Sequence, residues 1–239
     1  MRHSATLTLL AMCVFMLLAG MLMGQEAAPT TPKLAAEAKT LEDKVVIKED
    51  VLVVFMDEPE HHFDRAKEHF LKKEYEAAAK EIRKSAGFLK LQAARANGET
   101  KKALQASAEE LEKLAGDVEK GTVRTVDKLE KPFAAALHAL AQHHHQKASE
   151  SWMKRAEKKT GHDLKAAAHH VEHAARWSGE QLEEGGKLAV RDARLVSGKL
   201  VEGAGWSVEE VGKAVEGIGS AVKWVGKKVE PKKKEAPAK

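Results

Sequence analysis

The C-terminal part of the chain carries apolar residues at an alternating spacing of three and four. Every seventh residue from 201 to 229 is valine, and a second apolar row runs between the valines at Ala204, Val211, Ile218 and Val225. Rows with this spacing form the seam of a coiled coil. Together with a Ser207/Glu210 capping box and the stop at Pro231, they predict a helix from about Val208 to Val229.

Glycines follow the same seven-residue period beside this seam, from Gly198 to Gly226. An interior glycine lowers helix stability by up to ~1 kcal/mol relative to alanine, so packing against another helix must stabilise this one. We expect the partner to be the preceding helix or a second copy of the chain, with small residues allowing a close approach. The predicted interface consists of Val208, Val211, Gly212, Val215, Ile218, Gly219, Val222, Val225 and Gly226.

The rest of the chain favours helices in series. Helical patterns occur near 59–71, 75–96, 100–131, 133–158, 162–182 and 187–202, with breaks expected at Thr160-Gly161 and Gly185-Gly186. A β-like stretch lies at 45–55. Short connections favour antiparallel neighbours, so we predict an all-α, up-and-down helical bundle with a C-terminal Gly/Val heptad helix.

The first two predicted helices carry Ala66, Tyr75, Ala78 and Ile82 at spacings that resemble one tetratricopeptide-type helical hairpin. The resemblance covers about 30 residues, and no second copy follows one repeat period later. It therefore implies an antiparallel helix pair rather than a peptide-binding array.

The N-terminus has the pattern of an export signal. Arg2 is followed by an apolar run from Leu7 to Met23 and then by polar residues. We predict a signal peptide at 1–24 and a secreted or periplasmic protein, or a membrane-anchored one if the segment is not cleaved. The one cysteine, Cys13, lies inside this run, so the mature protein would have no disulfide or thiolate metal site.

Composition divides the remaining chain into four parts. We expect a tether with the β-like segment at 25–57, the bundle at 58–184, the Gly/Val heptad region at 185–230 and a basic disordered tail at 231–239. From residue 187 onward there are 12 Lys and Arg against 7 Asp and Glu. This excess of positive charge is typical of a solvated tail. The alternative is that it attracts the C-terminal region to anionic lipid at a membrane surface or to an anionic polymer. We expect no nucleic-acid partner.

Histidine is abundant, and all but one of the twelve lie between residues 61 and 173. On the fifth predicted helix, His162, His169 and His173 fall opposite the apolar stripe, so we expect them to face solvent. His169 and His173 are one turn apart and can bind Zn, Ni or Cu weakly, in the micromolar range. His144 is in line with Leu137 and Leu140, so it is the candidate inward histidine. A core site with His62 or His69, His144 and His170 is the alternative.

Residues 169–173 read His-His-Val-Glu-His, which resembles the H-x-x-E-H motif of inverzincin metallopeptidases. The resemblance implies that His169 and His173 bind zinc and that Glu172 activates water. That family also needs a distal carboxylate ligand and a large α/β domain, whereas this motif lies in an Ala/Glu/Lys-rich helical array. Only about 66 residues follow it. We therefore do not expect peptidase activity.

No phosphate-binding loop, haem-attachment motif or nucleophile elbow occurs in the sequence. The leading prediction is an exported, non-enzymatic helical protein without a cofactor. Its role would be structural or interactive, through protein binding or self-association of the heptad helix. The alternatives are a His-rich protein that binds or buffers metal, and a protein that binds anionic lipid or polymer through its basic C-terminal region.

Overall fold

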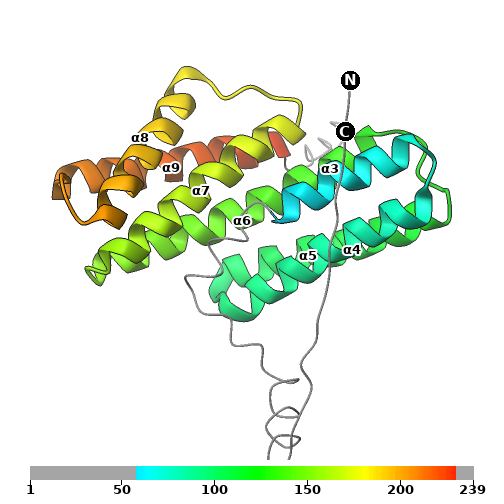
Figure 1. Cartoon of the computed structure of the whole chain (residues 1–239), viewed down its shortest axis with the longest axis horizontal. Coiled ribbons are helices and arrows are strands. Elements are labelled where there is room, and N and C mark those ends of the chain that lie inside the picture. The colour runs from blue at the N-terminus through cyan, green and yellow to red at the C-terminus, as the bar shows by residue number, and fades with distance from the viewer. Residues whose placement is uncertain (1–57, 230–239) are drawn as a thin grey trace, which may run out of the picture. The chain divides into compact units, whose positions relative to one another are not determined.

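The computed structural model describes residues 58–229, and within them seven α-helices follow one another through short connections (Figure 1). The predicted all-α helical bundle is confirmed, and no strand occurs among these residues. The predictions for 1–57, including the β-like segment, and for the tail from 230 fall outside the described residues. The helices are α3 (Glu58–Leu71), α4 (Tyr75–Arg95), α5 (Gly98–Glu119), α6 (Asp127–Met153), α7 (Glu157–Trp177), α8 (Glu184–Glu202) and α9 (Val208–Val229).

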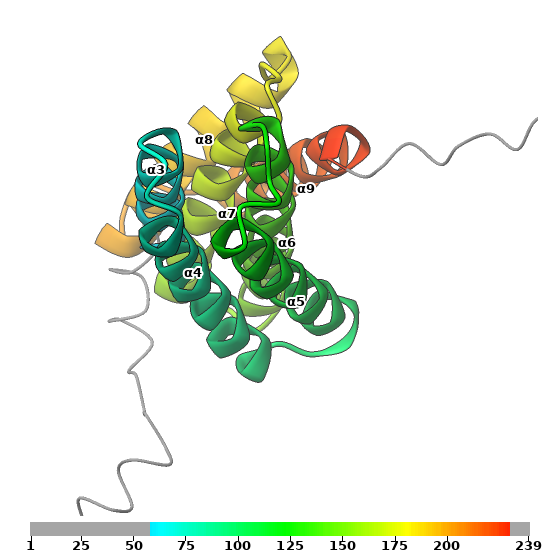
Figure 2. The same ribbon diagram turned by 90° about the vertical axis from the view of Figure 1, so that its right-hand side faces the viewer.

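The central pair of the bundle is α6 and α7. Residues 136–141 of α6 are all buried, which is expected of a helix covered on every side. In Figures 1 and 2, α3, α4 and α5 lie on one side of this pair, while α8 and α9 lie on another. The described helices therefore share one hydrophobic core, in which α6 contacts α3, α5, α7 and α9.

The first helix is joined to the central pair through aromatic side chains. Phe63 of α3 stacks on Phe133 of α6 with ring centroids 4.2 Å apart, and both rings contact Trp177 of α7 in a T-shaped arrangement. Such aromatic pairs stabilise by about 0.5–1.5 kcal/mol beyond the area they bury. They fix the N-terminal end of α3 against α7. The predicted α3–α4 hairpin is also present, with Ala66, Ala78 and Ile82 fully buried.

Three helix boundaries differ from the prediction. A new helix was expected from residue 133, but α6 begins at Asp127 and contains Pro132. The chain turns at residues 154–156, where Arg155 has φ 56°, and Gly161 lies inside α7 instead of breaking the helix. A Cβ on Gly161 would lie 2.9 Å from the carbonyl oxygen of Ser197 in α8. This glycine is therefore a point of close approach between two helices. Gly185 and Gly186 likewise fall in the first turn of α8.

The last helix, α9, has the predicted bounds, and the Ser207 hydroxyl accepts a hydrogen bond from the Glu210 N–H at 3.2 Å. It packs on α6, α7 and α8 of the same chain. None of the described helices is long and apolar enough to span a membrane.

The glycines of α9 face histidine rings of α6. His138 lies 3.1 Å from the Val222 carbonyl oxygen, and a Cβ on Gly226 would come within 2.8 Å of the same ring. One heptad away, His145 lies 3.2 Å from the Val215 carbonyl oxygen, and a Cβ on Gly219 would come within 2.7 Å of its ring. These two glycines make room for imidazoles rather than for a helix backbone.

Gly212 differs from Gly219 and Gly226, because a Cβ there would meet no atom within 4 Å. The prediction that the whole glycine row is closely packed is wrong at this position, and also at Gly198 and Gly205, where a Cβ would likewise meet no atom within 4 Å. One heptad beyond His145, α6 carries Trp152 instead of a histidine, and the Trp152 ring contacts that of Trp206.

Candidate metal site

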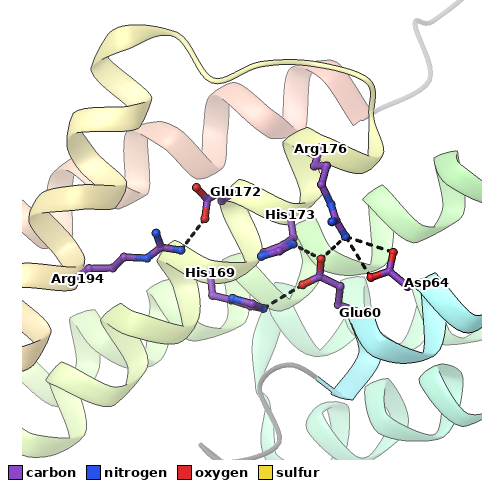
Figure 3. A network of polar contacts seen from close by, with 7 residues as sticks. All are labelled: Glu60, Asp64, His169, Glu172, His173, Arg176 and Arg194. Carbon is purple, nitrogen blue, oxygen red and sulfur yellow. Dashed lines mark hydrogen bonds and ion pairs between the residues drawn. The ribbon is translucent and has the colours of Figure 1, made fainter.

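Two histidines of α7 are drawn into the bundle by the start of α3. His169 and His173 were expected to face solvent, but only 16% and 22% of their side chains is exposed. The prediction is wrong because it took only one apolar stripe on α7 into account. The N-terminal turn of α3 covers the opposite face, and Glu60 meets both imidazoles there (Figure 3).

Glu60 is the centre of this polar cluster. Its side chain is 8% exposed, and its Oε2 lies 3.3 Å from Nε2 of His169. Its Oε1 contacts Nδ1 of His173 and also accepts a hydrogen bond from the Arg176 guanidinium. A carboxylate is stable in such a buried position only with partners of this kind.

The partners keep Glu60 ionised. Burial alone raises the pKa of a carboxyl group, but the contacts with His169 and His173 and the charge of Arg176 lower the pKa of Glu60 to about 2. At neutral pH the carboxyl group of Glu60 is therefore an anion. Its two oxygens can accept hydrogen bonds or coordinate a cation.

The cluster has the composition of a metal site. Glu60, His169 and His173 each offer one ligand atom, and these three atoms lie within 4.8 Å of one another. His169 and His173 are i and i+4 on one helix, which places their rings on the same face with centroids 4.2 Å apart. Two imidazoles and one carboxylate form a donor set that suits zinc and neighbouring transition metals.

Glu172, the acidic residue of the H-x-x-E-H match, points away from this cluster (Figure 3). Its side chain is half exposed, and its carboxylate accepts a hydrogen bond from Arg194 of α8 at 2.5 Å. The carboxylate beside His169 and His173 comes instead from Glu60, which the sequence motif does not include.

His144, the third candidate ligand, is buried as predicted but lies in a different contact. Its Nδ1 is 3.0 Å from the Asp163 carboxylate. Its ring stacks on that of His170 with centroids 5.6 Å apart. The His170 ring in turn contacts that of His169, with centroids 5.3 Å apart. His144 is therefore next to the cluster through another ring, not part of its donor set.

His143 and His170 are also buried, which the sequence pattern did not indicate for His143. Burial lowers the pKa of His170 well below its usual value and lowers the pKa of His143 to about 3, so both rings are neutral at pH 7. Neither ring nitrogen of His170 has a hydrogen-bond partner within residues 58–229. Rings 143, 144, 170, 169 and 173 form a continuous row of contacts along the α6–α7 interface.

The alternative core site with His62 or His69 is not formed. His62 contacts the buried Glu81 at 2.5 Å, and His69 contacts Glu74 at the same distance. Both residues lie on α3 but pair with carboxylates of the α3–α4 hairpin, so neither joins His144 and His170.

The predicted interface residues of α9 are mostly covered within the chain. Val211, Ile218, Gly219, Val222, Val225 and Gly226 are buried, Gly212 and Val215 are partly buried, and Val208 is 56% exposed. The apolar seam thus packs against α6, α7 and α8 in this structure.

Comparison with known proteins adds no relative. No family model, no curated protein and no solved structure matches the chain.

Proposed function

We propose that this is an exported, non-enzymatic helical protein that binds one divalent transition-metal ion between Glu60, His169 and His173. The observation that supports the proposal most is the convergence of a buried carboxylate and two imidazoles within 4.8 Å. One ligand comes from α3 and two come from α7, so a bound ion would cross-link the first described helix to the centre of the bundle.

The donor set favours zinc, nickel or copper over magnesium or calcium, because two of the three ligands are nitrogens. Three protein ligands leave at least one coordination position for water or for a ligand of another molecule. Structural zinc sites have four protein ligands, so we propose metal binding or buffering rather than a closed structural site.

The test is a Zn²⁺ titration of the protein purified without a polyhistidine tag. We expect one ion per chain at a dissociation constant of about 1 µM, equivalent to about 8 kcal/mol of binding free energy. His169→Ala, His173→Ala and Glu60→Gln should each weaken binding about tenfold or more, because each removes a ligand.

His162→Ala is the matched control, since it removes a histidine of the same helix that is not part of the cluster. The proposal fails if His169→Ala and His162→Ala lower the affinity by the same amount. The proposal also fails if the parent protein, without any substitution, binds no Zn²⁺.

The structural or interactive role and the binding of anionic lipid or polymer stay predictions from the sequence. Most seam residues that were expected to bind a partner are covered by the same chain, and the basic tail falls outside the described residues. Metal binding is therefore the function with a specific arrangement of side chains behind it.

A further inference from the structure

The Glu60 cluster contains a permanent cation of its own. Arg176 is always charged, and its Nη2 donates to the same Glu60 oxygen that His173 contacts. A metal ion held by Glu60 and His173 would lie beside this guanidinium. Two cations on one carboxylate oxygen repel each other at close range, so Arg176 and the ion compete for Glu60.

A second carboxylate lies within reach of the same guanidinium. Asp64 is one turn after Glu60 on α3, and its Oδ1 is 3.4 Å from Nη2 of Arg176. Figure 3 shows Arg176 reaching both carboxylates from the far end of the His169–His173 row. The chain therefore offers the arginine an alternative partner beside the first.

Exposure differs between the two carboxylates in a way that favours such an exchange. Glu60 is 8% exposed, whereas Arg176 and Asp64 are 52% and 55% exposed. Moving the guanidinium from Glu60 to Asp64 carries it toward solvent, where a charge needs little compensation. The buried carboxylate is then released for the ion.

We propose that Arg176 is a built-in competitor of the metal ion, and that Asp64 receives it when the ion binds to Glu60. Arg176 and Asp64 then set the affinity of the site. Before the ion binds, the positive charge of Arg176 compensates the negative charge of the buried Glu60. The inference rests on the proposed function, because it concerns the same ligands.

The experiment compares Zn²⁺ affinities of the full protein and its variants by competition with a chromogenic chelator. Arg176→Gln removes the competitor and should tighten binding about tenfold. Asp64→Asn removes the alternative partner, holds Arg176 on Glu60 and should weaken binding about threefold to tenfold. Arg194→Gln is the control, because Arg194 pairs with Glu172 and does not contact Glu60.

The double variant separates exchange from simple attraction. In the Arg176→Gln background, Asp64→Asn should change the affinity little, since no arginine remains to be received. An equal loss in both backgrounds would show that Asp64 attracts or binds the ion directly, and would overturn the exchange.

Unchanged or weaker binding by Arg176→Gln, with zinc still lost on His169→Ala, would overturn this inference and leave the proposed function standing. Absence of zinc binding by both the parent and Arg176→Gln would remove the site itself. Circular dichroism and thermal melts of each variant show whether a loss of binding reflects a loss of folding.

Discussion

At the scale of single residues, burial gives histidines of one sequence cluster different chemistry. His143, His144 and His145 are consecutive, yet His143 is buried in the core, His144 contacts Asp163 of α7 and His145 contacts the backbone of α9. Because successive residues on a helix point about 100° apart, the three neighbours enter three different environments. The chemistry of each ring follows from the element it meets.

His143 should make the protein sensitive to acid. Its pKa is lowered from 6.5 to about 3 by burial and by the neighbouring His144 and Lys147. Between these two pH values, His143 binds a proton in the unfolded chain but not in the folded chain. Stability contributed by the neutral ring is therefore present above pH 6.5 and lost as the pH falls toward 3. The free energy of unfolding should drop by up to ~1.4 kcal/mol per pH unit from this group alone.

Urea melts of the parent and His143→Gln between pH 7 and pH 4 measure this term. We expect a shallower pH dependence for the variant, because glutamine does not titrate. His61→Gln, at an exposed position, is the matched control. Parallel curves for the parent and His143→Gln would show that His143 binds a proton equally well in both states.

At the scale of elements, the α6–α9 contact depends on pairs of one histidine and one glycine. The glycine row of α9 meets α6 at Gly219 and Gly226, whereas Gly212 has open space around it. Alanine substitution should therefore have opposite effects along one row.

Gly212→Ala should stabilise the protein by up to ~1 kcal/mol, because alanine is the better helix former. Gly226→Ala should destabilise it by about 1–3 kcal/mol, because the new Cβ displaces the buried His138 ring from the Val222 carbonyl. Thermal and urea melts of both variants give the two signs.

A second background tests the cause of the Gly226 effect. In His138→Ala the ring is absent, so Gly226→Ala should no longer destabilise and should approach the gain at Gly212. Equal destabilisation by Gly226→Ala in both backgrounds would mean that the methyl group disturbs α9 itself and does not act through the His138 ring.

Local patterns allowed the elements to be predicted from the sequence, while contacts between distant segments did not follow from it. The bounds of α9 and its Ser207 cap depend on neighbours in the chain, and both are confirmed. Gly161 was taken for a helix break, because a glycine that lets α7 approach α8 has the same local signature as one that ends a helix. Glu60 was missed for a related reason, since no spacing rule links it to His169.

At the scale of the whole molecule, the candidate site connects parts of the chain that are far apart in sequence. Glu60 lies in the first described helix, and its partners lie in the fifth. The site therefore exists only when the bundle is folded, and an ion that binds there stabilises the folded state.

Export concerns the molecule as a whole and is also open to test. The apolar run from Leu7 to Met23 supports the proposal that the protein leaves the cytoplasm without residues 1–24. Fractionation followed by intact-mass spectrometry should find the shortened chain outside the cytoplasm. Finding the full-length chain in the soluble cytoplasmic fraction would contradict the proposal.

The histidine–glycine pairs between α6 and α9 also restrict how this protein can change length during evolution. His138 and His145 are seven residues apart, as are Gly226 and Gly219, and the two helices run antiparallel. An insertion or deletion of one to six residues between the paired positions of either helix moves one histidine and its glycine out of register. Adding seven residues to both helices together preserves every pair, so related chains should differ here by whole heptads.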